Sequence, residues 1–517
     1  MSFDQRNQLQ QFRNKLYHSC FPRRRDAIFE LLDANCATRD ARSVISLCKS
    51  PYFTRQYPSI TDALTDGLEV ADWENAAKLL WKTVHPTESA PYYRFALDCT
   101  PNSRLHARKS DDRSIVHYPN PAPGNKPICA GHEYSVVAYL PPGNSKDRKT
   151  WCVPLSVERV PSHHKGSEFG LSQMNALRKT LNLKQELCVT VGDTAYSNTA
   201  CQKAISEQSN SVHIARLKSN RNVYDLLAKV EGRGPGQPKR YDRKMALNQP
   251  ETLFPHDEEI FVPFEDFNGS PCVYQVTAWN EKVFKSTKEF KAHEHPFRLI
   301  RVIALNSKEK PIFKRPMWLA VFGDKRMELS IAECCDNYFA RYDIEHFNRF
   351  GKQSLLMDSY QSAEVTHEEN WWRLCGIAYN QLYLSRHLTH AMPETWERYL
   401  PEFKHTSQDE FTTPAMTQRG FSKVLDDIGT PAKEPISRGN PLGRQPGECP
   451  EKRSEKPIVF KGSQAKKSSK GIPKDFKKTF GNSKPEDIQK TMQQIKRMLC
   501  NAGISVEEFC DFALNSA

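Results

Sequence analysis

Four polar side chains recur at helical spacing in the segment YFARYDIEHFNRFGK: Tyr338, Arg341, Glu345 and Lys352. At about 100° per residue, a continuous helix places all four within a sector of about 60°. A carboxylate beside a phenol and two cations suits a phosphodiester, because the acid can hold a metal while the cations bind phosphate oxygens. A solvated, salt-bridged helix face has the same pattern, so this segment alone leaves both interpretations open.

Two aspartates lie upstream, each at the expected end of a strand. Asp98 is expected to end the strand in YYRFALDCT, and Asp193 the buried strand in ELCVTVGD. Side chains at strand ends can converge on a ligand outside the sheet. Each aspartate alone is also typical of a turn or a helix cap. Their conjunction with Glu345 is what indicates a site.

Asp98, Asp193 and Glu345 would together suit two divalent cations about 3.5–4 Å apart. Mg²⁺ fits such a set, because it accepts few carboxylates and completes its shell with water and substrate phosphates. One cation would activate an attacking water or 3′-hydroxyl, and the other would stabilise the leaving oxygen. The three residues therefore predict metal-assisted phosphoryl transfer.

The elements that must position these residues differ along the chain. Residues 1–88 are predicted to form a helical domain, because apolar residues recur at helical spacing in LQQFRNKLYHSCF and RRDAIFELLDANC. Exposed arginines there suit DNA binding or dimerisation, and a scaffold against the next domain fits equally well. In residues 89–221 the order is three strands, helix, strand, helix, strand, which predicts an α/β layer with a mixed sheet.

Antiparallel alternation follows in residues 222–330, in EEIFVPFEDF, PCVYQVTAW, FRLIRVIAL and PMWLAVF. We expect a β-rich insertion there. The segment also holds a basic, Gly/Pro-rich loop at Arg233–Lys244, which is expected to be exposed. Helical periodicity returns in residues 331–404, the expected end of the core, which carries Glu345.

The C-terminal residues divide into a linker and a hairpin. Residues 405–482 are predicted to be a basic Pro/Gly-rich linker, since residues 431–480 alone hold 13 Lys and Arg against 5 Asp and Glu. A strap that tracks phosphates and a solvated tail without a fixed role both fit this composition. Residues 483–517 predict a helical hairpin, with a capping box at Ser505 and Glu508.

The composition of the whole chain limits the kinds of partner and cellular compartment that fit it. The 517 residues carry a formal net charge of +13 and a pI near 9.0, which favours a polyanionic partner such as nucleic acid. The 15 cysteines include no C-x-x-C pair, so no zinc finger is indicated and reduced thiols in a cytosol are expected. No apolar N-terminal region and no apolar run of 18 residues occurs, which predicts a cytoplasmic protein without membrane contact.

Taken together, these motifs resemble the DDE-type transposases of bacterial insertion sequences, in the subgroup marked by a Y-R-E-K helix signature. Tyr338, Arg341, Glu345 and Lys352 match that signature in type and spacing. The second-Asp motif reads Asp193-Thr194-Ala195-Tyr196, with Ala where the subgroup has Gly. The first-Asp segment FALDCTPNS resembles the family's D-x-T start. The specific motifs span residues 90–400, the N-terminal helices match more loosely, and the last 35 or so residues match nothing.

The resemblance implies a fold and a set of roles. The core would be an RNase H-like mixed sheet with a β-rich insertion between the second Asp and the Glu. Asp98, Asp193 and Glu345 would be catalytic and hold two Mg²⁺ ions, with Mn²⁺ as a substitute. The expected DNA-binding residues are Tyr338, Arg341, Lys352, Trp318 and Arg104, and a surface arginine without a phosphate contact is the alternative for Arg104. Trp318 would stack on a flipped base, although a core role fits it as well. His132 is either a site residue or a hydrogen-bonded structural histidine.

The function that these expectations describe is cut-and-paste DNA transposition. The protein would cleave at terminal inverted repeats and join the 3′ ends to target DNA. Its partners would be the double-stranded DNA of the transposon ends and the target, and a second copy of the chain in a synaptic homodimer. Its location would be the cytoplasm of a prokaryote, at the nucleoid. A transposition-inactive, DNA-binding derivative and a stand-alone RNase H-like nuclease are the alternatives.

Overall fold

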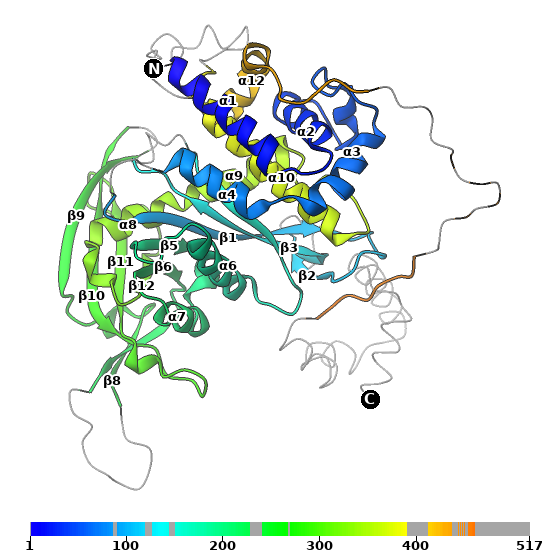
Figure 1. Ribbon diagram of the computed structural model, residues 1–517. Coiled ribbons are helices and arrows are strands. Elements are labelled where there is room, and N and C mark those ends of the chain that lie inside the picture. The colour runs from blue at the N-terminus through cyan, green and yellow to red at the C-terminus, as the bar shows by residue number, and fades with distance from the viewer. Residues whose placement is uncertain are drawn as a thin grey trace, which may run out of the picture.

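The computed structural model describes residues 2–85, 90–118, 127–143, 150–227, 240–266, 269–389, 412–436 and 453–460, with Gly443, Gln445, Gly447 and Cys449. The predicted hairpin at 483–517, most of the linker at 405–482 and most of the basic loop at Arg233–Lys244 lie outside these residues. Figure 1 shows a large sheet with the N-terminal helices gathered on one side and helices α6 and α7 on the other.

The N-terminal residues form the helical region that the apolar spacing predicts. Its elements are α1 (Ser2–Ser19), α2 (Arg25–Ala37), η1 (Ile45–Lys49), α3 (Pro58–Asp62), η2 (Ala63–Gly67), η3 (Leu68–Val70) and α4 (Trp73–Val84). Helix α2 is almost fully buried, because it packs against α10 (Val365–Ser385) and α12 (Pro414–Ile428). The region is thus packed onto the C-terminal helices of the core.

Six strands build the first part of the sheet. They are β1 (Tyr93–Ser103), β2 (Ser114–His117), β3 (Ile128–Tyr139), β4 (Val153–Val160), β5 (Cys188–Gly192) and β6 (Ser211–Leu217). β1, β5 and β6 run parallel, while β3 pairs antiparallel with β1, β2 and β4. Helices α6 (Gly166–Thr180) and α7 (Thr199–Ser206) and the short η4 (Thr194–Ser197) connect β4, β5 and β6. The mixed sheet and the helical region are consistent with an RNase H-like core.

The β-rich segment extends this sheet. Strand β12 (Met317–Phe322) pairs antiparallel with β6, and β11 (Phe297–Leu305), β10 (Pro271–Lys282) and β9 (Glu258–Glu265) follow in order. The sheet therefore has ten strands, and β7 (Asn222–Leu226) and β8 (Tyr241–Ala246) form a separate pair. Single-turn helices η5 (Pro250–Thr252), η6 (Ala292–Glu294) and η7 (Arg326–Glu328) complete the segment.

The helix predicted to carry Tyr338, Arg341, Glu345 and Lys352 is interrupted. Helix α8 (Ile331–Ala340) ends before Arg341, and α9 (Tyr342–Ser354) begins after it. The prediction of one continuous helical face was therefore wrong. Arg341 keeps right-handed helical angles, so the chain turns at this residue without leaving the helical region of backbone space.

One further sequence expectation needs correction, and one strand was missed. Asp98 does not end its strand, since β1 continues to Ser103. The short edge strand β2 was not predicted, because its four residues lie among polar turn residues. In the part of the chain that the structure describes, no helix has the length and apolar content to cross a bilayer.

Candidate active site

Asp98 and Asp193 lie at the same edge of the parallel part of the sheet. The pairing of β1 with β5 runs from Tyr93 to Ala96, and β5 ends at Gly192. Beyond Ala96, β1 pairs with β3 alone, so Asp98 lies at an open edge although it is within its strand. Asp193 directly follows β5, and its carboxylate accepts a hydrogen bond from the backbone N–H of Ala195 at 2.9 Å. The carboxyl end of β5 thus brings both aspartates to one place.

The turn between α8 and α9 carries the third carboxylate. The guanidinium of Arg341 donates a hydrogen bond to Glu345 one turn later. It also lies 5.8 Å from the ring centroid of Tyr338, whose side chain is buried. Tyr338, Arg341 and Glu345 therefore form one cluster despite the interrupted helix.

The charges in this cluster act on Asp98. Burial raises the pKa of the Asp98 carboxyl, and the negative charges of Asp193 and Glu345 raise it further, against the opposing effect of Arg341. The resulting pKa is about 7. Like charges close to a carboxyl disfavour its ionised form, so these two acids add to the effect of burial. Asp193 and Glu345 therefore lie near enough to Asp98 for their charges to act on it.

Lys352, the last residue of the signature, contacts the part of β1 that follows Asp98. Its ammonium donates to the hydroxyl of Thr100 at 2.7 Å and to the carbonyl of Pro101 at 2.6 Å, on the part of β1 beyond Asp98. It also lies 5.8 Å from the ring centroid of Trp372. Burial lowers the pKa of Lys352, while Asp358 and Asp98 act in the opposite direction.

Asn348 is a site residue that the sequence analysis missed. It lies on α9 three residues after Glu345, and its side-chain amide donates to Asp98 Oδ2 at 2.7 Å. Its spacing of three residues from Glu345 and four from Lys352 places it on the same helix face. This spacing was the only sign of it in the sequence, since an asparagine has no charge to mark it.

Residues 16–259 match the family model described as DDE superfamily endonuclease. This match supports a DDE-type transposase family. It also supports a nuclease or transposase type of function. The matched span contains Asp98 and Asp193 and ends before Glu345, so the third carboxylate rests on the geometry given above. The comparison with curated proteins found no match for the chain.

The donor chemistry of a DDE site suits a divalent metal, and the three acids have that chemistry. Within the described ranges, no group of three or more His, Cys, Asp or Glu side chains is already gathered as a metal site. The raised pKa of Asp98 nevertheless marks a place where the negative charges are not fully compensated. A cation of charge two would supply that compensation, once Glu345 exchanged Arg341 for the metal.

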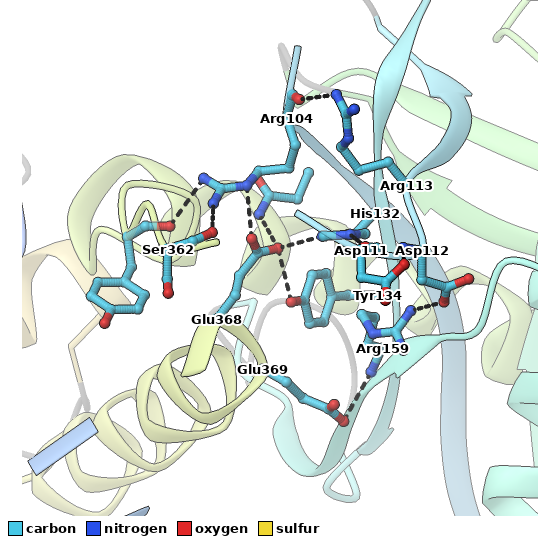
Figure 2. A network of polar contacts seen from close by, with 12 residues as sticks. Arg104, Asp111, Asp112, Arg113, His132, Tyr134, Arg159, Ser362, Glu368 and Glu369 are labelled. Atoms are coloured by element: carbon cyan, nitrogen blue, oxygen red, sulfur yellow. Dashed lines mark hydrogen bonds and ion pairs between the residues drawn. The ribbon is translucent and has the colours of Figure 1, made fainter. Parts of the chain in front are cut away.

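Arg104 does not fit the predicted phosphate contact. The side chain is only 3% exposed, and its Nε lies 2.8 Å from Glu368 Oε2 on α10. It also donates to the backbone carbonyls of Tyr360 and Ser362 (Figure 2). The prediction is corrected because a guanidinium held in a buried ion pair cannot reach a phosphate without breaking that pair.

His132 belongs to the same buried network. Its Nδ1 lies 3.1 Å from Glu368 Oε1, and its Nε2 lies 3.0 Å from the carbonyl oxygen of Asp111 (Figure 2). Tyr134 and Asn102 donate to the same carboxylate oxygen. The structure therefore favours the hydrogen-bonded structural histidine over the site residue.

Trp318 is a core residue in this structure. It is 1% exposed on β12, and its ring lies 5.7 Å from that of Trp279. The predicted stacking on a flipped base is corrected, because no face of this ring is open to a base. Trp371 and Trp372 on α10 are fully buried, as expected of core residues.

Proposed function

We propose that this protein is a DNA transposase that cuts at terminal inverted repeats and joins the freed 3′ ends to target DNA by a cut-and-paste route. The observation that carries the proposal is that burial and the nearby charges of Asp193 and Glu345 raise the pKa of Asp98 to about 7, beside Arg341. Carboxylates with uncompensated charge next to fixed cations suit metal-assisted phosphoryl transfer. The match to a DDE superfamily endonuclease model supports the same chemistry.

Each residue of the site would have a definite role. Asp98, Asp193 and Glu345 would hold two Mg²⁺ ions, for which Mn²⁺ can substitute. The bound ions would supply activation of the attacking hydroxyl and stabilisation of the leaving oxygen. Arg341, released from Glu345, would turn its planar donors to a phosphate, for which a guanidinium is well shaped.

The remaining signature residues would orient the DNA strand. Lys352 lies beside β1 just beyond Asp98, where its ammonium could exchange Thr100 and Pro101 for phosphate oxygens. Tyr338 would provide a phenol next to Arg341. Because two transposon ends must be held together, we propose a homodimer as the acting form, with DNA drawn to the chain by its charge of +13.

The test is cleavage of a labelled duplex that carries the candidate terminal repeat, with Mg²⁺ or Mn²⁺ present. Wild type is expected to cut at the repeat boundary and to join the 3′ end to a target duplex. Glu345→Gln should do neither, because it removes one metal-binding charge. Glu207→Gln is the matched control, since Glu207 caps the C-terminal end of α7 and forms an i,i+4 ion pair with Lys203.

The outcomes separate the three candidate functions. Cutting and joining that require Glu345 and not Glu207 would support the transposase. Cutting without joining would favour a stand-alone nuclease. Binding of the repeat without cutting, in wild type and both variants, would favour the DNA-binding derivative and overturn the enzyme.

A further inference from the structure

Asn348 is buried in the candidate active site, and only the Nδ2 atom of its side-chain amide forms a hydrogen bond among the described residues. The residue is 7% exposed, and its Nδ2 donates to Asp98 Oδ2 at 2.7 Å. Its Oδ1 has no hydrogen-bond partner among the described residues. A buried oxygen without a partner is unfavourable for folding, so an apolar side chain of similar size would suit packing better. The position therefore favours a function for the amide over a packing role.

The contact fixes one atom of the Asp98 carboxylate. Asp98 lies on β1, where pairing with β5 has ended, so the sheet does not constrain its side chain on that edge. Asn348 holds Oδ2 from the α9 side, one helical turn after Glu345. The same hydrogen bond ties the strand with the first acid to the helix with the third. A donor of this kind orients a metal-binding carboxylate before the metal arrives.

We propose that Asn348 is a positioning residue, which holds the Asp98 carboxylate toward Asp193 and Glu345 so that a divalent cation can bind all three. The inference rests on the proposed function. It extends the site by one residue on α9, and it assigns the role to the N–H of the amide.

The test measures Mn²⁺ binding to the full-length, DNA-free protein by electron paramagnetic resonance. Asn348→Leu keeps the volume and removes the donor, and Asn348→Ser gives a second variant whose hydroxyl is too short to reach Asp98. Both should weaken Mn²⁺ binding by about 10–100-fold, as losses of residues that orient metal ligands do. Single-turnover cleavage should slow to a similar extent, while the affinity for repeat DNA stays within about twofold.

Asn380→Leu is the matched control. Asn380 is also buried, donates through Nδ2 to the carbonyl of Pro154, and has an Oδ1 without a partner in the described chain, but it lies on α10 away from the carboxylates. Its loss should leave Mn²⁺ binding unchanged. Unchanged Mn²⁺ binding in both Asn348 variants, with wild type active, would overturn the positioning role alone. A wild type that neither binds Mn²⁺ nor cuts DNA would overturn the proposed function together with this inference.

A separate observation concerns the free edge of the sheet at β2. Residues 453–460 lie along this edge, more than 330 residues away in sequence. The N–H of Val459 donates to the carbonyl of Arg113 at 2.7 Å. The N–H of Lys456 donates to the carbonyl of Arg108 at 2.8 Å. Val459 and Ser114 form a parallel β-bridge. These are the contacts of an added edge strand.

Side chains reinforce this docking at the start and in the middle of the segment. Arg453 pairs with Glu364 at the start of α10, with 2.8 Å between the charged atoms. The buried guanidinium of Arg113 donates to the carbonyl of Lys456 at 3.1 Å. Arg113 also donates to the carbonyl of Arg104, within the network of Figure 2. The segment is thus held on the β2 edge by backbone hydrogen bonds and by charged side chains.

We infer that the β2 edge is a docking site for residues 453–460 of the same chain. The docked segment covers backbone groups that would otherwise be open to pairing with another chain, which is one way in which proteins protect sheet edges. This inference does not depend on the proposed function.

A cysteine pair tests the docking in the full-length protein. Ser114→Cys with Val459→Cys places two thiols on paired residues, and oxidation with copper–phenanthroline should join them within one chain, giving a fast-migrating monomer on a non-reducing gel. Either single variant is the control. Arg453→Glu should slow the cross-link, and adding Glu364→Arg should restore it.

Two outcomes would overturn this inference. Cross-linked dimers in place of monomers would mean that the segment docks on a second copy. No cross-link beyond that of the single variants would mean that the segment does not dock on β2.

Discussion

At the scale of single residues, Asp98 is a carboxyl group whose ionised form is disfavoured by folding. Its pKa in the folded, metal-free protein is about 7, against an ordinary value of 3.8. Between these two pH values the unfolded chain releases the proton while the folded chain keeps it, so stability falls as the pH rises. Above pH 7 the full penalty applies, and it is absent below about pH 4.

We therefore predict that Asp98→Asn stabilises the metal-free protein at pH 8 while it abolishes cleavage. The free energy of unfolding should rise by about 1–2 kcal/mol, which is less than the full free energy that corresponds to the pKa shift of Asp98. Denaturant titrations with EDTA at pH 8 and pH 4 would measure it, and the gain should vanish at pH 4. A variant that is less stable than wild type at pH 8 would contradict the electrostatic account.

Glu368 is the opposite case, a buried carboxylate that folding favours as an anion. Burial opposes its charge, but the hydrogen bond and charge of His132, with Arg104 and Tyr134, hold the pKa of Glu368 below its ordinary value. A lowered folded pKa gives stability that is present at neutral pH and is lost as the pH falls through that pKa. Figure 2 shows how this carboxylate joins α10 to His132 and Tyr134 on β3, and Asn102 on β1 donates to it as well.

Glu368→Gln should accordingly destabilise the protein at pH 7. The change leaves the buried cations of the network without their counter-charge, which costs about 3–5 kcal/mol. Denaturant unfolding would show it, and Glu364→Gln on the exposed side of the same helix start should cost less than about 1 kcal/mol. Equal losses from the two variants would mean that the network contributes nothing beyond a surface ion pair.

At the scale of elements, α8 begins at a capping box and ends at the turn that contains Arg341. Ser330 and Glu333 form a capping box, in which each side chain binds the backbone N–H of the other. Ser330→Ala should lower the free energy of unfolding by about 1 kcal/mol. Thermal unfolding would measure this loss, and the rate of cleavage should stay close to that of wild type because the cap lies at the end of α8 remote from Arg341. A cleavage defect larger than the stability loss would show that the position of α8 sets the geometry of the site.

The same elements show what the sequence could and could not predict. The buried strands β5 and β6 were predicted because short runs of apolar and β-branched residues, such as CVTVG, are typical of buried strands. The helix break at Arg341 is not marked by a Gly or a Pro, so the helical spacing of the sequence predicted a continuous helix there. The acids were predicted from their charge, whereas Asn348 and the burial of Arg104 and Trp318 depend on contacts between residues far apart in the chain.

At the scale of the whole molecule, one sheet and one set of helices replace the separate parts that the sequence suggests. Strands β9–β12 continue the sheet that holds Asp98 and Asp193, so the β-rich segment fixes the position of β6 and, through it, β5. Helix α10 packs on β4 and also on α1, α2 and α12. The N-terminal helices therefore contribute to the support of the site even though they lie away from it.

Arg13 is one of the residues that join the N-terminal helices to the core. It is 1% exposed on α1, pairs through two nitrogens with Asp33 on α2 at 2.6 and 2.8 Å, and donates to Gln381 on α10. Arg13→Met would leave Asp33 charged, buried and unpaired, and should lower the free energy of unfolding by about 3–5 kcal/mol. Adding Asp33→Leu removes that stranded charge, so the double variant should regain much of the loss.

The measurement for Arg13 is a double-variant cycle by denaturant unfolding, followed by fluorescence and circular dichroism. Partial recovery in the double variant would show that the cost comes from the isolated charge. Simple addition of the two single losses would contradict this, and would mean that the shape of the contact outweighs its charge. Because α10 also carries Glu368, a loosened Arg13 contact should lower the stability of the core itself, and the two optical signals should still report one transition.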